Sequence, residues 1–183
     1  MIFDPTPLAG AYLIELERKG DERGFFARAF CEREFQAHDL VSHFCQVNNS
    51  LSVHKGTLRG LHYQLAPMAE TKLVRCIRGA LYDLILDLRQ GSLTFGESFG
   101  AELTAENRRM MYVPKGFAHG FITIADHTET FYFADEFYSA EHERGVRYDD
   151  PTFKLKWPVT PTVVSDKDKN YRNFDRAWHL GVR

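Results

Sequence analysis

The sequence predicts an all-β fold of the jelly-roll type, with short helices at its periphery. About ten short segments with alternating apolar and polar residues follow one another at even spacing, as in a sandwich or barrel. Turn residues such as those in "KGDERG" separate these segments. Phe, Trp and Tyr make up 14% of the chain, and aromatic residues favour strands.

The first half of the chain supplies the clearest elements. Alternation begins in "GAYLIELE" (10–17), and "GFFARAF" (24–30) is expected as the next strand. In "EREFQAHDL" (32–40), Phe35 and Leu40 stand among polar residues, which predicts a short helix. The remaining expected strands are 45–53, 57–65, 72–89, 97–105, 108–114, 118–125 and 128–138.

Two features complete the predicted architecture. Residues 72–89 are long enough for two strands, and Arg78–Gly79 is expected as the hairpin turn between them. From about residue 151 the chain is polar and proline-containing, so we expect loops and one short helix packed over the barrel. Without linkers or repeats, residues 1–183 are expected to form a single domain.

Composition restricts the classes of function. The formal net charge is -2, which does not indicate binding to nucleic acid or to a membrane surface. Three cysteines without C-x-x-C spacing predict reduced thiols rather than disulfides or a zinc site. The N-terminal residues lack the pattern of a signal peptide, and no apolar run could span a bilayer. We therefore expect a soluble cytoplasmic protein.

His62, in the strand-like segment "TLRGLHYQ" (57–64), is the central candidate residue. A metal-binding jelly roll often carries H-x-H on one strand, but this sequence has Gln64 at the second position. A later histidine, His119, lies in "PKGFAHGF". Two histidines without a further nitrogen or sulfur ligand make a poor transition-metal site, so no metal is predicted.

Other ionisable residues accompany His62 on the predicted strands: Arg59, Lys72, Asp83, His119 and Tyr132. Several such groups facing one barrel interior are costly unless a ligand binds there. A neutral imidazole can remove a proton, a tyrosine can return one, and a lysine can stabilise an oxyanion. These groups favour proton abstraction next to a carbonyl.

Strand parity raises a question about Arg59 and His62. In a flat strand their side chains would point to opposite faces. A bulge at Gly60 would bring both into the pocket, and the alternative is that Arg59 reaches the site of another subunit. Asp83 and Asp87 share the same strand parity, which leaves a paired-carboxylate site open. We favour Asp83 as the hydrogen-bonding partner of a pocket histidine and Asp87 as a strand-end charge beside Arg89.

Several polar residues are expected to lie at the surface. The run "DKDKNYR" is interpreted as a solvated loop, apart from Lys167 and Asp168. The histidines expected at the surface are His38, His43, His54, His127, His142 and His179.

Taken together, the motifs resemble those of the dTDP-4-dehydrorhamnose 3,5-epimerase family. They are "DERGFF", "QVNNS", "TLRGLHYQ", "KLVRCIRGALYDLILDLR", "TFG", "YVPKGFAHGF", "ERGVRYDDP", "KWP" and "SDKD". The resemblance extends from about residue 20 to residue 170. It implies a cupin-like jelly roll, a homodimer with exchanged strands, no metal or organic cofactor, and a nucleotide-linked 4-keto-6-deoxyhexose as substrate.

The resemblance also implies roles for individual residues. His62 resembles the general base, Asp168 its carboxylate partner, and Tyr132 the acid on the opposite face of the sugar. Lys72 is similar to the group that stabilises the enolate, and His119 to the second histidine of the pocket. The remaining implied substrate contacts are Arg23 and Arg59 to the diphosphate, Tyr138 to the base, and Gln46, Asn48, Glu143 and Lys167.

Two positions depart from the family pattern. Arg28 stands where the family has a glutamate that accepts from thymine, and arginine has only donors. Cytosine presents acceptors at N3 and O2, to which a guanidinium can donate, so one hypothesis is a CDP-sugar substrate. The alternative is that Arg28 points to solvent or phosphate. Phe133 replaces a polar residue and could reshape the pocket near Tyr132.

Three alternatives to double epimerisation of a dTDP-sugar therefore stay open. One is a mono-epimerase that inverts carbon 3 or carbon 5 of a CDP-linked sugar. Another is a catalytically silent sugar-binding cupin, and the third is a metal-dependent cupin enzyme.

Overall fold

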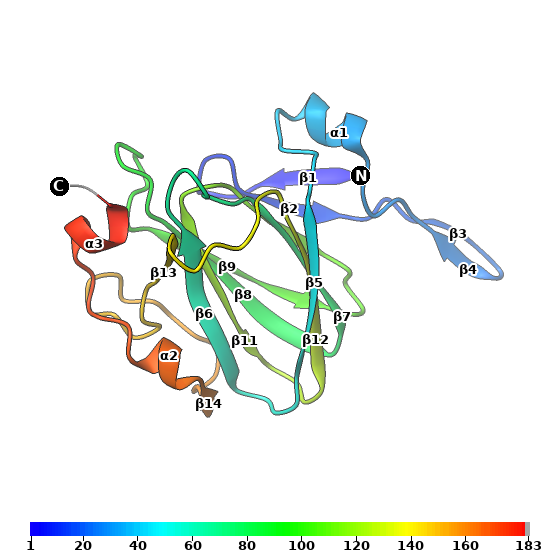
Figure 1. Cartoon of the computed structure of the whole chain (residues 1–183). Coiled ribbons are helices and arrows are strands. Elements are labelled where there is room, and N and C mark those ends of the chain that lie inside the picture. The colour runs from blue at the N-terminus through cyan, green and yellow to red at the C-terminus, as the bar shows by residue number, and fades with distance from the viewer. Residues whose placement is uncertain (182–183) are drawn as a thin grey trace.

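Residues 1–181, which the computed structural model describes, form two facing β-sheets and a separate hairpin (Figure 1). The first sheet has the order β1 (Ile2–Pro5), β2 (Tyr12–Glu15), β10 (Met110–Val113), β7 (Lys72–Arg78), β12 (Thr128–Ala134) and β5 (Gln46–Ser52). The second has the order β13 (Glu143–Gly145), β6 (Thr57–Gln64), β11 (Phe117–Thr123), β8 (Ala80–Asp87) and β9 (Ser98–Thr104). Neighbouring strands are antiparallel, except that β14 (Val163–Val164) runs parallel to β6. The jelly-roll prediction is confirmed.

The main core lies between the two sheets. Strand alternation directs every second apolar side chain inward, so Val74 of β7 and Met111 of β10 meet Leu81 and Ile85 of β8. All four are essentially inaccessible to solvent. Burying this apolar surface stabilises the folded state by about 25 cal/mol per Å² and so holds the two sheets together.

The strand predictions agree well with the structure in the middle of the chain. The expected hairpin turn is confirmed, because β7 ends at Arg78, Gly79 has φ +71°, and β8 begins at Ala80. Strands β1, β3 (Lys19–Asp21), β13 and β14 were not predicted, and β3 lies in the segment expected as a turn. They contain two to four residues, too few for alternation to be recognised, and form only because a neighbouring strand offers hydrogen-bonding groups.

The helices are short. Helix α1 (Glu32–Ala37) ends before the predicted residue 40, because Asp39 has φ +57° and turns Leu40 back toward the core. The C-terminal region contains two helices, α2 (Asp166–Lys169) and α3 (Arg176–Leu180), instead of the single one expected. Ser165 and Asp175 cap their N-termini, which lets so few residues form a turn. No helix within residues 1–181 is long and apolar enough to cross a bilayer.

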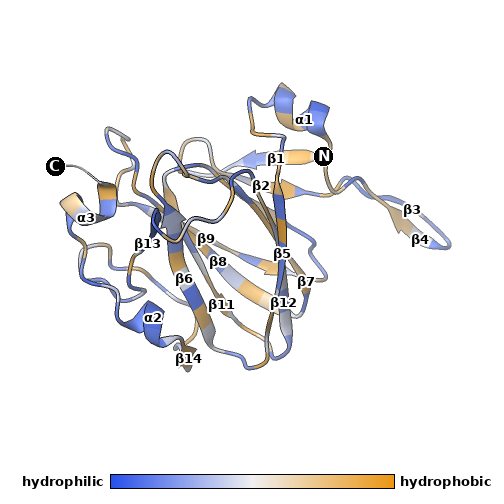
Figure 2. Ribbon diagram, viewed as in Figure 1, coloured by the Kyte–Doolittle hydropathy of each residue, from blue (hydrophilic) through white to orange (hydrophobic). Residues whose placement is uncertain are grey.

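The hairpin of β3 (Lys19–Asp21) and β4 (Gly24–Phe26) projects away from both sheets (Figure 1). The expected strand at 24–30 thus ends at Phe26, because residues 27–30 have no strand to pair with. Figure 2 shows that β4 is hydrophobic although it extends into solvent. Phe26 is 71% exposed, an unusual position for a large apolar side chain.

Candidate active site

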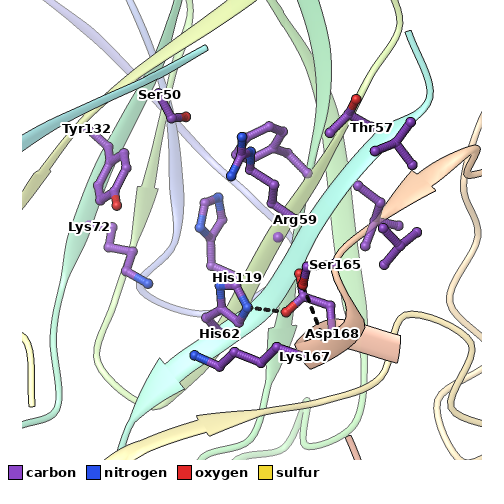
Figure 3. A pocket seen from close by; sticks show the side chains of 15 residues that line it. Ser50, Thr57, Arg59, His62, Lys72, His119, Tyr132, Ser165, Lys167 and Asp168 are labelled. Atoms are coloured by element: carbon purple, nitrogen blue, oxygen red, sulfur yellow. Dashed lines mark hydrogen bonds and ion pairs between the residues drawn. The ribbon is translucent and has the colours of Figure 1, made fainter. Parts of the chain in front are cut away.

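A cavity of about 460 Å³ opens between the sheets, and a second lobe of about 230 Å³ adjoins it. His62, Lys72 and Tyr132 line both lobes. His62 comes from β6 of one sheet, whereas Lys72 and Tyr132 come from β7 and β12 of the other. Figure 3 shows these side chains converging on one space, with Asp168 behind His62.

A bulge in β6 brings Arg59 and His62 to the same pocket. His119 of β11 pairs with His62, but Phe121 pairs with Arg59, so one strand has an extra residue between these pairs. Gly60 adopts φ +113°, and a Cβ there would lie 2.6 Å from the Cα of Gly120. Glycine is therefore required, and the predicted bulge is confirmed.

His62 forms a short hydrogen bond with Asp168. The two groups are 2.6 Å apart, from Nε2 to Oδ1, and Oδ2 accepts the Gly60 N–H at 3.2 Å. Burial alone would raise the pKa of Asp168, but hydrogen bonding to His62 and the charge of a protonated His62 hold that pKa below its usual range. An ionised Asp168 accepts the Nε2 proton, which leaves the lone pair on Nδ1 of His62.

A second histidine–aspartate pair lies beside the first. His119 Nε2 and Asp83 Oδ1 are 2.8 Å apart, and Asp83 is completely buried on β8. The expected pairing of Asp83 with a pocket histidine is confirmed. Asp87 is equally buried but belongs to a different cluster, where Arg89 donates to it at 3.0 and 2.8 Å, as the strand-end interpretation expects.

Lys72 and Tyr132 form the opposite wall of the pocket. The ammonium group of Lys72 lies 2.9 Å from Glu70, a residue that the sequence analysis missed. Alternation could have identified it, because in "ETK" residues 70 and 72 have the same parity and side chains two apart share a face of a strand. Burial, with the charge of Glu70, raises the pKa of Tyr132. Tyr132 therefore holds its proton at neutral pH and can act as a donor.

Residues predicted to contact the substrate surround the smaller lobe. Gln46, Asn48, Tyr138 and Glu143 line it, and Tyr138 is exposed at its edge. Glu143 accepts from the Tyr138 hydroxyl at 3.0 Å and from Lys167 Nζ at 2.6 Å. Despite the opposing effect of burial, these bonds lower the pKa of Glu143. The lobe thus presents an aromatic ring, an amide and charges of both signs.

Arg23 and Arg28 do not reach the pocket of their own chain. Arg23 lies in the turn of the β3–β4 hairpin, is 85% exposed, and donates through Nε to Asp21 at 3.1 Å. Arg28 follows the hairpin and lies 3.5 Å from Glu34. Arg28 is exposed in this chain, and its contact with a base, a phosphate or solvent stays a prediction.

Two residues, His179 and Phe133, do not lie where the sequence predicted. His179 is fully buried, because Asp175 begins helix α3 and turns His179 under Phe174. Burial lowers its pKa. Phe133 packs against Phe44 on the outer face of its sheet, so it does not reshape the pocket near Tyr132.

The segment "DKDKNYR" is also more structured than expected. It begins with helix α2, and the ring of Tyr171 packs edge-on toward His62 with their centroids 6.1 Å apart. The other five histidines that were expected at the surface are exposed or half-buried. Among residues 1–181, no group of three or more His, Cys, Asp or Glu side chains is arranged to hold a metal ion.

A jelly roll whose pocket places a histidine–aspartate pair opposite a tyrosine and a lysine holds the groups that general acid–base catalysis requires. The family profile described as dTDP-4-dehydrorhamnose 3,5-epimerase matches residues 5–176. The chain belongs to this family and is an isomerase that acts on a nucleotide sugar.

Individual relatives support the family assignment. The dTDP-4-dehydrorhamnose 3,5-epimerase of Shigella flexneri is 44% identical over 170 residues, which cover 92% of this chain and 93% of the relative. The crystal structure of the Elizabethkingia anophelis enzyme of that name has a TM-score of 0.92, 40% identity, and coverage of 95% and 96%. A Legionella pneumophila 3,5-epimerase in complex with dTDP-4-keto-L-rhamnose has a TM-score of 0.89 at 36% identity, with coverage of 98% and 96%.

Proposed function

We propose that this protein inverts carbon 3 and carbon 5 of a dTDP-linked 4-keto-6-deoxyhexose. The observation that carries the proposal is the 2.6 Å contact between His62 and Asp168, opposite Tyr132 in one cavity. A relative that binds dTDP-4-keto-L-rhamnose at 36% identity supports the same substrate class.

His62 is the proposed general base. Its Nδ1 lone pair takes the hydrogen next to the ketone, and the C–H electron pair becomes the π bond of an enolate. Lys72 donates to the enolate oxygen and stabilises its negative charge. Asp168 stabilises the imidazolium that forms and keeps the proton of neutral His62 on Nε2.

Tyr132 is the proposed acid. It gives its proton to the opposite face of the same carbon, the ketone re-forms, and the stereocentre is inverted. Tyrosinate and imidazolium remain after this step, and both must exchange a proton with solvent before the second carbon reacts. Solvent hydrogen therefore enters the product at each inverted centre, which distinguishes catalysis from simple binding.

The remaining pocket residues are proposed to hold the nucleotide. Arg59 and Lys167 carry the positive charge that a diphosphate requires, and a guanidinium can bind phosphate through two parallel hydrogen bonds. Tyr138 offers its exposed ring to the base, while Gln46, Asn48 and Glu143 supply polar contacts around the smaller lobe. His119 lies beside His62 as a polar contact for the sugar.

A homodimer with exchanged hairpins is part of the proposal. The outer face of the first sheet exposes Val47, Leu51 and Ile77, and monomers rarely leave such apolar surface uncovered. The projecting hairpin carries the exposed Phe26 and holds Arg23 in its turn, outside its own pocket, so a partner's pocket is its proposed destination. The unpaired thiols fit the reducing cytoplasm, where we place the protein.

One experiment tests both the reaction and the nucleotide. Proton NMR in heavy water follows dTDP- and CDP-4-keto-6-deoxyglucose after addition of the enzyme. We expect deuterium at carbon 3 and carbon 5 of the dTDP-sugar, and much slower exchange of the CDP-sugar. Exchange at a single carbon would identify a mono-epimerase, a preference for CDP would support the Arg28 hypothesis, and no exchange would indicate a binding protein.

A further inference from the structure

Glu70 is a buried carboxylate in the pocket to which the proposed mechanism gives no role. Its Oε1 lies 2.9 Å from Nζ of Lys72, and the side chains are only 13% and 11% exposed. It lines the smaller lobe together with Lys72 and Tyr132. An ionised side chain this deeply buried is costly unless its partner and its position are well defined.

The backbone around Glu70 is held from both sides. Asp135 accepts the Thr71 N–H at 2.6 Å through its carboxylate, and the Asp135 N–H donates to the Thr71 carbonyl at 3.2 Å. Gln64 donates to the Met68 carbonyl at 2.9 Å. These contacts hold the backbone on both sides of Glu70 and so keep this residue within reach of Lys72.

The contact also orients the lysine. The negative charge of Glu70 attracts the ammonium group of Lys72, whose Nζ lies 2.9 Å from Oε1. The three N–H donors of the ammonium group can contact the substrate ketone. A flexible four-carbon side chain thereby presents its charge in one place instead of sampling many rotamers.

The negative charge of Glu70 also acts on the pKa of Tyr132. Desolvation is the largest cause of its raised pKa, the negative charge of Glu70 acts in the same direction, and Arg59 opposes both. Figure 3 shows the Tyr132 hydroxyl directed toward Lys72. The other titratable side chains that line the two lobes are His62, Tyr63, His119, Tyr138, Glu143, Lys167 and Asp168.

We propose that Glu70 is a positioning residue for the epimerisation: it fixes the Lys72 ammonium beside Tyr132 and balances the lysine's charge, so that Tyr132 remains the proton donor. The inference rests on the proposed function of the pocket. Glu70 itself touches neither proton in transit, and it acts through its two neighbours.

The first test is a titration that needs no substrate. Tyrosine and tyrosinate differ in ultraviolet absorption, and the difference between a protein and its Tyr132→Phe variant isolates the titration of Tyr132. The measurement is made with wild-type Glu70, with Glu70→Gln and with Glu70→Asp. We expect a lower midpoint in Glu70→Gln, since the negative charge is gone, and a midpoint near that of the wild type in Glu70→Asp, which keeps the charge.

The second test is the pH dependence of deuterium incorporation. In Glu70→Gln we expect about a 10-fold loss of kcat at neutral pH with little change in KM, because a misplaced catalytic group costs rate rather than binding. The alkaline limb of the profile should also move to lower pH. Glu102→Gln is the matched control, because Glu102 is an exposed carboxylate on β9 that lines neither lobe.

The outcomes separate the two proposals. An active wild-type enzyme whose Glu70→Gln variant keeps both the tyrosine midpoint and the pH profile would overturn the role of Glu70 and leave the proposed function intact. A wild-type protein that incorporates no deuterium would overturn the proposed function, while the titration would still report whether Glu70 controls Tyr132. Circular dichroism would show whether Glu70→Gln fails to fold. In that case the test is the kcat of Glu70→Asp, whose shorter side chain reaches less far toward Lys72. An undiminished kcat in Glu70→Asp would contradict the proposed role of the contact with Lys72.

Discussion

His62 Nε2 lies 2.6 Å from Asp168 Oδ1 although 106 positions separate the two residues in the chain. Asp168 is positioned by the short helix α2, and Ser165 accepts its N–H at 3.1 Å. The helix contacts β6, so the carboxylate arrives directly behind the imidazole.

Asp168→Asn should lower the rate of deuterium incorporation by roughly 1,000-fold, because a neutral amide neither selects the Nε2–H form of His62 nor stabilises imidazolium. His62→Asn should cause a loss of similar size. The double variant should be no worse than either single one, since the pair acts as a unit. Fully additive losses would show that the two residues work independently.

Tyr132→Phe should separate exchange from inversion. His62 can still remove the hydrogen and return solvent deuterium to the same face, so we expect deuterium in recovered substrate while product formation falls by at least about 100-fold. NMR of the sugar ring measures both at once. Tyr148→Phe, which alters a tyrosine that lines neither lobe, is the control. Normal inversion in Tyr132→Phe would remove this residue as the acid.

Gly60→Ala should destabilise the protein by about 3 kcal/mol and impair activity, because the new Cβ meets the Gly120 backbone at 2.6 Å in a left-handed conformation. Gly91→Ala is the matched control, since Gly91 also has positive φ but has no heavy atom within 4 Å of the added Cβ. It should cost only about 1 kcal/mol. Denaturant unfolding measures both, and equal losses would show that crowding in the bulge is unimportant.

Asp87 should contribute to stability in a pH-dependent way. Its pKa is about 2 despite burial, because Arg89, Ser92 and Thr94 donate to it, whereas the unfolded value is 3.8. A lowered pKa stabilises the fold above pH 3.8, and this contribution of about 2 kcal/mol is lost as pH falls from 3.8 toward 2. The melting temperature of Asp87→Asn should therefore vary less over this window than that of wild type. Asp149→Asn, at an exposed carboxylate, should retain the wild-type slope.

Phe26→Asp should weaken the proposed dimer, because it places a charge on an apolar residue of the exchanged hairpin. Sedimentation should detect monomer at concentrations where the wild type is dimeric. Leu93→Asp is the control, since Leu93 is fully exposed on a loop of the barrel itself. An unchanged dimer in Phe26→Asp would contradict hairpin exchange.

Subunit mixing tests whether Arg23 serves the partner's pocket. Chains with Asp168→Asn are refolded together with chains carrying Arg23→Ala. If Arg23 enters the partner's pocket, each mixed dimer contains one site with both substitutions and one site with neither. The activity of the mixture should then exceed that of either homodimer. If Arg23 served its own chain, every site would keep a lesion and mixing would restore nothing.

Much of the barrel could be predicted from local patterns. Alternation in residues 57–65 and 72–89 identified β6, β7 and β8, because a strand with one buried face repeats every two residues. The same parity argument led to the bulge at Gly60. These features depend on neighbours in the chain or on one adjacent strand.

Only the tertiary structure decided the rest. It brought Glu70 to Lys72, buried His179 beneath a short C-terminal helix, and left Arg23 on a hairpin outside its own pocket. The short strands β13 and β14 likewise exist through their pairing with β6. The physical reason is that burial and charge pairing depend on which distant segments pack together, and a repeating pattern within one segment carries no record of its partner.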